Sequence, residues 1–187
     1  MVEAFTLSRA SRSGAVFDED KLRWLNAVYI RNTGVDDLVK RLDPFLREAG
    51  YSPDALKPQW LRRVIETVKD ELMTLGDIGE HIELFFDDRF AVNQEARALL
   101  DTENARKVTA AFGEYLAGAA GEPRDIYAAA IKYAKDRSGG KGRDLFMPLR
   151  AALTGKVQGP ELDRVFEILG KSSAEKRLKL AGGEGKE

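Results

Sequence analysis

Apolar residues recur at intervals of three and four positions along most of the chain, the spacing that places them on one face of an α-helix. The clearest sets are Val35, Leu38, Val39, Leu42 and Leu46, followed by Trp60, Leu61, Val64, Ile65, Val68 and Leu72. No stretch alternates strictly between apolar and polar residues, the pattern typical of a half-buried strand. The chain is therefore predicted to be all-α, a helical bundle or cage of eight to ten short helices in two or three small subdomains.

Capping and breaking residues predict where several helices begin and end. Asp18 is a suitable N-cap for a helix that runs to about Arg31, and Thr33-Gly34 breaks the pattern after it. The following helix is expected to be interrupted at Asp43-Pro44, because proline disrupts a helix interior. The first twenty residues show no helical period and are expected to be extended or loop.

Two prolines in the C-terminal third each predict the start of a helix. Because proline lacks a backbone N–H, helices are expected to begin at Pro148 and Pro160, with Gly155 and Gly170 ending them. Four basic residues lie nearby in the sequence: Lys141, Arg143, Arg150 and Lys156. Free N–H groups at helix starts together with positive charge suit an anionic or hydrogen-bonding partner, although basic helix ends commonly just face water.

Composition narrows the class of protein. A chain of 187 residues with 43% hydrophobic content can bury a substantial core. The net charge of −1 argues against a basic nucleic-acid binder overall. The charge is unevenly distributed, however, since residues 124–179 hold 13 lysines and arginines against 7 aspartates and glutamates. Such a segment could bind a polyanion through one face, or it could form an ordinary solvated surface of mixed charge.

Residues that would support catalysis or metal binding are scarce. The chain has no cysteine and a single histidine, His81, which no serine or cysteine motif accompanies. Gly139-Gly140-Lys141 lacks both the upstream glycine and the following Ser/Thr of a P-loop. No apolar run is long enough to span a bilayer, and no signal-peptide pattern is present, so a cytoplasmic protein with no membrane contact is expected.

These observations favour a binding module rather than an enzyme. One alternative is a helical protein-interaction or scaffold module that does not bind nucleic acid. That alternative would require an exposed apolar surface, whereas every strong apolar stripe is expected to lie in the core. Trp24 and Trp60 both fall within helical apolar periods and are expected to pack there rather than to serve as stacking surfaces.

Two stretches resemble a known family. FTLSRASRSGAVFDEDKLRWLNAVYIR, residues 5–31, is similar to the segment of bacterial glutamyl-tRNA synthetases just downstream of their catalytic nucleotide-binding fold. GRDLFMPLRAALTGKVQGPEL, residues 142–162, resembles the anticodon-binding end of the same family. The resemblance extends over essentially the whole chain, with the middle similar in pattern only.

The resemblance implies that catalysis and tRNA binding lie in different parts of the parent enzyme. The parent enzyme would be a class I synthetase that charges tRNA(Glu) with glutamate, using ATP and Mg²⁺ in a catalytic domain upstream of this chain. The fragment itself would be non-catalytic, monomeric and without cofactor or metal, and tRNA(Gln) is a second candidate partner. Residues 1–50 would end the stem-contact region, while 51–90 and 91–187 would form two helical anticodon-binding subdomains.

The same resemblance implies which residues bind RNA. The anticodon-binding candidates are Met147, Arg150, Gly159, Pro160 and Leu162. The candidates for phosphate contacts, chosen for their charge and position, are Lys141, Arg143, Lys156, Arg62 and Arg63. Unstacked anticodon bases need backbone and arginine donors at their edges together with a surface to stack on, which agrees with the basic, helix-rich pattern of this segment.

The chain departs from the family pattern at three places. Met147 stands where some members carry a large aromatic residue, so it can cover a base but stacks less well. Residues 11–14 are Ser-Arg-Ser-Gly where the family prefers Ser-Lys-Ser-Pro. Glu71-Leu72-Met73 replaces residues that are basic in many members, so no arginine contact is expected from that turn.

Overall fold

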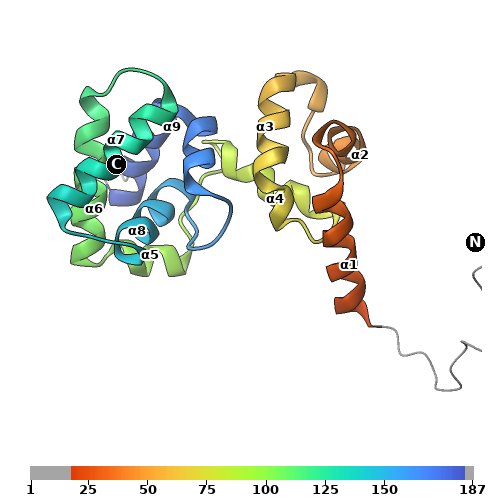
Figure 1. Ribbon diagram of the computed structural model, residues 1–187, viewed down its shortest axis with the longest axis horizontal. Helices are drawn as coiled ribbons and strands as arrows, with labels where there is room; N and C mark the ends of the chain where they lie inside the picture. The colour runs from red at the N-terminus through yellow and green to blue at the C-terminus, as the bar shows by residue number, and fades with distance from the viewer. Residues whose placement is uncertain (1–17, 184–187) are drawn as a thin grey trace, which may run out of the picture.

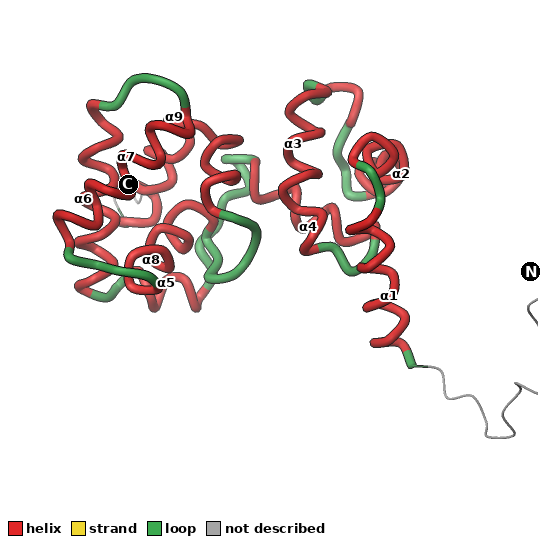
Figure 2. Tube along the Cα trace, in the orientation of Figure 1, coloured by secondary structure: helices red, strands yellow, loops and turns green. Residues whose placement is uncertain are grey.

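The computed structural model describes residues 18–183, and within that range it contains nine α-helices and no strand (Figure 1, Figure 2). The all-α prediction is confirmed. The helices form two lobes that lie side by side, and the first helix projects away from the N-terminal lobe. The expectation that the first twenty residues are extended or loop is wrong for Glu19 and Asp20, because the first helix begins at Glu19. Residues 1–17, including the Ser-Arg-Ser-Gly departure, lie outside the described residues.

The N-terminal lobe contains four α-helices and four short 3₁₀ turns. The helices are α1 (Glu19–Asn32), α2 (Val35–Glu48), α3 (Pro58–Val68) and α4 (Ile78–Ile82). The 3₁₀ turns are Pro53–Ala55, Lys69–Glu71, Leu75–Asp77 and Glu83–Phe85. The apolar stripes of α2 and α3 meet over α4, and Leu42, Leu46, Val64 and Ile65 are completely buried there. This core continues across residue 50, and the subdomain boundaries at 50 and 90 stay a prediction.

The C-terminal lobe contains the remaining five helices. They are α5 (Gln94–Leu100), α6 (Glu103–Gly118), α7 (Pro123–Ser138), α8 (Arg143–Thr154) and α9 (Leu162–Gly182). Phe112 and Phe166 meet edge to face at the centre of its core, with ring centroids 6.0 Å apart. Helix α9 also connects the lobes, because Val165, Ile168 and Leu169 pack against the N-terminal core.

The predicted N-cap at Asp18 is confirmed, and α6 is capped in the same way. The Asp18 carboxylate accepts a hydrogen bond from Lys21 N at 3.0 Å, and Thr102 Oγ1 accepts one from Ala105 N at 3.2 Å. Gly170 has backbone angles (φ 71°, ψ 171°) that interrupt α9, as predicted. These ends follow local chemistry, because each cap satisfies an N–H that the helix itself leaves free.

The prediction that Pro148 begins a helix is wrong. Helix α8 begins at Arg143, and Pro148 lies inside it. Because Pro148 has no N–H, the carbonyl of Asp144 four residues earlier loses its helical partner. Asn104 of α6 supplies the replacement, since its Nδ2 donates to Asp144 O at 2.8 Å. The predicted interruption at Pro44 is also wrong, because α2 continues through that residue.

The two tryptophans lie in different environments. Trp60 packs edge to face against Phe85 and Phe86, which confirms the expected packing, but its side chain is only half-buried. Trp24 is 57% exposed, so the expectation that it packs in the core is wrong. The expectation that every strong apolar stripe is buried fails with it, since α1 also exposes Leu22, Leu25 and Tyr29 among the described residues.

A buried arginine joins three parts of the chain at the junction between the lobes. Arg177 of α9 is completely buried, and its Nε donates to Asp87 Oδ1 at 2.8 Å. Its Nη1 donates to Leu84 O at 2.8 Å and to Leu153 O at 2.9 Å. The guanidinium also lies over the ring of Phe90, 4.9 Å from the centroid. The Arg177 cluster therefore fastens the last 3₁₀ turn of the N-terminal lobe and the linker between the lobes, residues 86–93, to the end of α8.

A close backbone contact completes this junction. Asn93 N donates to Gly155 O at 2.9 Å, which holds the linker against the end of α8. Gly155 has φ +70°, and a Cβ atom added there would lie 2.0 Å from Ala91 O. Only glycine fits this position, because other residues would be strained by both the backbone angle and the contact.

Gly155→Ala is expected to lower the free energy of unfolding by about 2 kcal/mol or more, because it introduces a left-handed alanine and a clash with Ala91. Gly113→Ala in α6 is the matched control. A Cβ there meets only Leu178 Cδ1 at 3.7 Å, and alanine favours a helix by up to about 1 kcal/mol. Urea unfolding followed by circular dichroism measures both variants, and equal stability of the two would contradict the account.

Asp87→Asn is expected to cost about 1–2 kcal/mol of unfolding free energy near neutral pH, because the charge-assisted bond to Arg177 is weakened. Burial raises the pKa of Asp87, but hydrogen bonds with Arg177 and Ser173 and the Arg177 charge outweigh it, leaving the pKa below its ordinary 3.8. The carboxylate therefore stabilises the fold above about pH 4, and this contribution is lost as the pH falls further.

Urea titrations between pH 3 and pH 7 test this dependence. The stability difference between the wild type and Asp87→Asn should be largest near neutral pH and should shrink below about pH 4. Asp136→Asn, at an exposed position on α7, serves as the control and should match the wild type throughout. A constant difference at every pH would show that the Asp87 charge is not responsible.

Candidate nucleic-acid interface

The segment between α8 and α9, residues 155–161, is held by Arg150 and is called the α8–α9 loop below. Arg150 Nη1 donates to Gly159 O at 2.9 Å and to Pro160 O at 2.7 Å. Both hydrogens of Nη1 are thereby used. Within the described chain no hydrogen bond uses Arg150 Nε or Nη2, so one edge of the half-buried guanidinium retains its donors.

A threonine closes the other end of the loop. Thr154 Oγ1 lies 2.8 Å from Arg150 O and 3.0 Å from Lys156 O, and it accepts from Lys156 N at 3.2 Å. Lys156 and Gln158 are exposed, whereas Val157 is buried among residues of α5 and α8. The loop thus presents two polar side chains and its backbone outward while its apolar residue anchors it.

The structure brings the anticodon-binding candidates together around this loop. Arg150 contacts Gly159 and Pro160 directly, and Met147 lies one helical turn before Arg150 on α8. Leu162 and Pro160 are buried, so their side chains support the loop from beneath rather than forming an open surface. The groups of this region that can contact a ligand directly are the loop backbone, the exposed side chains of the loop and the free edge of Arg150.

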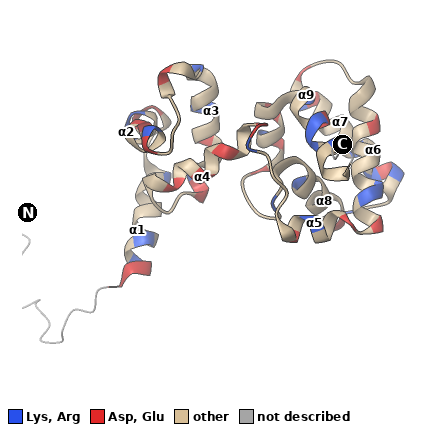
Figure 3. Cartoon of the chain, turned by 180° about the vertical axis from the view of Figure 1, so that it is seen from behind, with Lys and Arg blue, Asp and Glu red and all other residues tan. Residues whose placement is uncertain are grey.

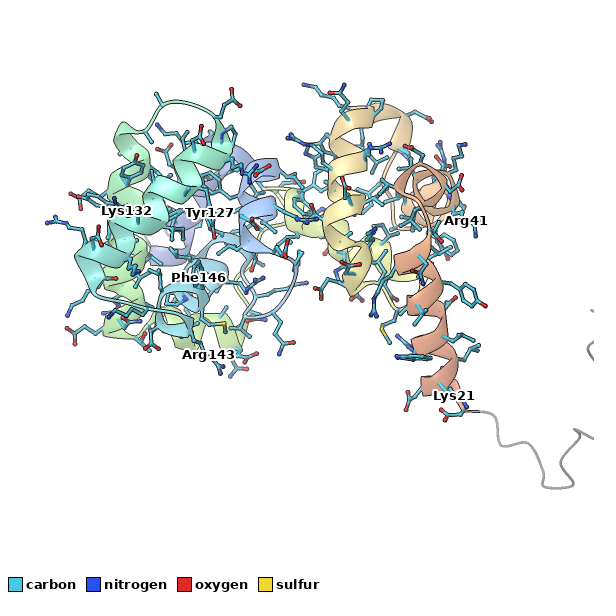
Figure 4. The ribbon with its side chains drawn as sticks, in the orientation of Figure 1. Lys21, Arg41, Tyr127, Lys132, Arg143 and Phe146 are labelled. Atoms are coloured by element: carbon cyan, nitrogen blue, oxygen red, sulfur yellow. The ribbon has the colours of Figure 1, made fainter. Side chains whose placement is uncertain are left out.

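The phosphate-contact candidates do not form one cluster. Lys141 and Arg143 are exposed at the start of α8, where Arg143 and Met147 line a hollow of about 190 Å³ (Figure 4). Lys156 lines a second hollow of about 250 Å³ together with Arg89 of the linker. Figure 3 shows Lys and Arg interspersed with Asp and Glu over both lobes, so the basic bias of the C-terminal third does not produce a uniform basic face in this view.

Arg62 and Arg63 lie on α3, in the other lobe. Arg62 forms an exposed ion pair with Asp36 of α2. Arg63 faces the junction between the lobes, where it shares a hollow of about 290 Å³ with Arg164, Glu66 and Glu167. These two residues share hollows with residues of α9, the helix that follows the α8–α9 loop, but not with residues of the loop itself.

His81 is the single histidine of the chain. His81 is half-buried, and burial lowers the pKa of its imidazole despite nearby carboxylates, of which Glu71 has the largest effect. No set of three or more His, Asp and Glu residues converges as metal ligands within residues 18–183. No helix in that range is long and apolar enough to cross a membrane.

Arg177 is the residue in this region that sequence reasoning missed. Its spacing from Ala174, Leu178 and Ala181 places it on the buried face of α9. That spacing could have identified it, but an arginine between lysines is more often solvated. Its Nη2 atom is buried without a hydrogen-bond partner, which shows how completely the cluster is enclosed.

Comparison with known proteins agrees with this architecture. A glutamate–tRNA ligase of Syntrophus aciditrophicus is 39% identical over 181 residues, which cover 97% of this chain and 37% of the relative. The Bacillus subtilis glutamate–tRNA ligase is 36% identical over 181 residues, covering 95% of this chain and 38% of that protein. The chain thus spans a little over a third of the length of these relatives.

Solved structures show the same fold. The crystal structure of a glutamate tRNA ligase from Elizabethkingia meningosepticum superposes with a TM-score of 0.77 at 20% identity, covering 97% of this chain and 36% of that one. The glutamate–tRNA synthetase of Elizabethkingia anophelis gives a TM-score of 0.71, also at 20% identity, with coverage of 96% and 34%. The family described as "Anticodon binding domain" matches residues 37–181. This chain therefore belongs to the anticodon binding domain family.

Proposed function

We propose that this chain is the tRNA-binding part of a glutamate–tRNA ligase, and that it holds the anticodon loop of tRNA(Glu) while a catalytic part outside this sequence attaches glutamate. The observation that carries the proposal is the anchored Arg150, which lies in a member of the anticodon binding domain family beside an outward-facing loop. The choice of glutamate and tRNA(Glu) rests on its relatives, which are glutamate–tRNA ligases.

The proposed recognition uses the two edges of Arg150 differently. One edge is committed to Gly159 O and Pro160 O, which removes most of the side-chain freedom before RNA arrives. The other edge carries donors at Nε and Nη2 that can bond to two acceptors of one unpaired base. Met147 can cover the base, and the loop backbone around Gly159 can supply further polar contacts.

In this proposal, glutamate is attached to the tRNA by other parts of the ligase. We propose that this chain contributes binding and that the catalytic groups lie elsewhere in the ligase, since no serine or cysteine motif accompanies the single histidine, His81. ATP and Mg²⁺ act in the catalytic part, and the chain needs no cofactor of its own. We further propose that it is a monomer of the cytoplasm and that tRNA(Gln) is a possible second partner.

Arg150→Ala is expected to weaken binding of the tRNA(Glu) anticodon stem-loop by about 1–3 kcal/mol, because a two-bond contact to a base is lost. Fluorescence anisotropy at two salt concentrations measures the affinity. Arg150→Lys should recover only part of it, since an ammonium cannot form the same paired contact. Parallel titrations with the tRNA(Gln) stem-loop show whether the site distinguishes the two RNAs.

Lys132→Gln is the matched control, because Lys132 is an exposed cation on α7, away from the N-terminal lobe (Figure 4). It should bind like the wild type. Equal binding by the wild type and Arg150→Ala would contradict the proposed contact. Recovery of a protein partner without RNA would favour a helical protein-interaction module instead, and ATP–pyrophosphate exchange by this chain alone would overturn the assignment of the chemistry.

A further inference from the structure

A groove of about 840 Å³ lies between the lobes, and its lining includes no residue of the α8–α9 loop. Most of its lining comes from the first turns of α3, and one residue comes from α9 of the other lobe. The lining residues are Lys57, Pro58, Gln59, Trp60, Arg62, Arg63 and Ile168. Its composition is unusual for a surface of mixed charge, because it combines an aromatic residue, aliphatic side chains and three cations with no carboxylate.

The aromatic residue of the groove is held in a fixed orientation. Trp60 is half-buried, and its indole meets Phe86 at 5.5 Å with an interplanar angle of 67°. It meets Phe85 at 6.4 Å and 87°. Two edge-to-face contacts restrain the ring, while Pro58 and Ile168 provide apolar neighbours in the groove. A restrained, partly exposed indole is suited to stacking against a nucleobase, since every base has a π-face.

The charges of the groove suit a phosphate. Arg62 is paired with Asp36, but Lys57 and Arg63 form no ion pair within the described residues. Glu66 and Glu167 lie in the adjoining hollow beside Arg63 and Arg164, so the groove proper carries the excess of positive charge. A ligand with one negative charge and one planar apolar group complements this arrangement.

The groove is close to the proposed anticodon site along a single helix. Leu162 begins α9 directly after the α8–α9 loop, and Ile168 lies six residues later on the same helix. Six residues of α-helix span about 9 Å. A single-stranded RNA segment that contacts the loop is thus near enough to place a neighbouring nucleotide in the groove.

We propose that this groove binds an unpaired nucleotide that flanks the anticodon triplet, with the base stacked on Trp60 and its phosphate between Lys57 and Arg63. This inference rests on the proposed function and extends it to a second contact on the same RNA loop. Because stacking and phosphate contacts are tolerant of sequence, the groove adds affinity without distinguishing one triplet from another.

Tryptophan fluorescence tests the proposal directly. Trp24→Phe leaves Trp60 as the only indole of the chain, so the emission reports on the groove. Titration of this variant with the tRNA(Glu) anticodon stem-loop should quench that emission. Trp60→Leu should weaken binding of every stem-loop tested by about fivefold to a hundredfold. Because Trp60 also packs on Phe85 and Phe86, its stability must be checked alongside by urea unfolding.

Two surface variants keep the test independent of folding. Lys57→Gln and Arg63→Gln should each weaken stem-loop binding by a similar factor for tRNA(Glu) and tRNA(Gln), and each should reduce the slope of log affinity against log salt by about one. Lys40→Gln, an exposed cation on α2 with no part in the groove, is the matched control and should leave the slope unchanged.

The outcomes separate this inference from the function on which it rests. Quenching of Trp60 together with reduced salt slopes supports the groove as an RNA site. Stem-loop binding that depends on Arg150, with unchanged Trp60 emission and unchanged salt slopes, overturns the groove and leaves the anticodon proposal intact. Absence of binding by any stem-loop overturns both.

Discussion

The cluster around Arg177 is the interaction on which the relation between the two lobes depends. A buried guanidinium is costly unless its hydrogen bonds are nearly all satisfied, because water that would solvate it is excluded. Here a carboxylate, two backbone carbonyls and an aromatic face compensate for part of that cost at Nε and Nη1, while Nη2 is buried without a partner. The partners belong to the last 3₁₀ turn of the N-terminal lobe, to the linker that follows it and to the end of α8, so the charge can remain buried only while these segments stay in place.

This constraint reaches the proposed RNA site through α8. Leu153, whose carbonyl accepts from Arg177, lies one residue before Thr154, which in turn contacts the backbone at Arg150 and Lys156. Arg150 then fixes Gly159 and Pro160. The loop is therefore supported from both ends by hydrogen bonds to backbone atoms, an arrangement that holds its shape without depending on the identity of the exposed side chains.

Much of the fold follows from local patterns, and the exceptions have specific tertiary causes. The stripes on α2 and α3 predicted helices because burial of one face is enough to define them. The prediction that a helix begins at Pro148 failed because Asn104 replaces the missing hydrogen bond to Asp144 O. Asn104 is 40 residues away from that acceptor in the sequence. The prediction that Trp24 packs in the core failed because periodicity indicates a helical face without indicating what covers that face. For the candidate site, Arg150 and its loop came from resemblance to a family, whereas the role of Arg177 required the positions of three separate segments.

Asn104 supplies the hydrogen bond that Pro148 cannot, and this replacement affects how the C-terminal lobe deforms. A helix that completes its own hydrogen bonds can fray or shift independently of its neighbours, but α8 relies on α6 for the donor to one of its carbonyls, Asp144 O. The two helices are thus joined by a hydrogen bond from a side chain of α6 to the backbone of α8. The first turn of α8 is consequently held in place by α6, so a substitution of Asn104 in α6 can change the position of the helix that carries Arg150 without itself contacting RNA.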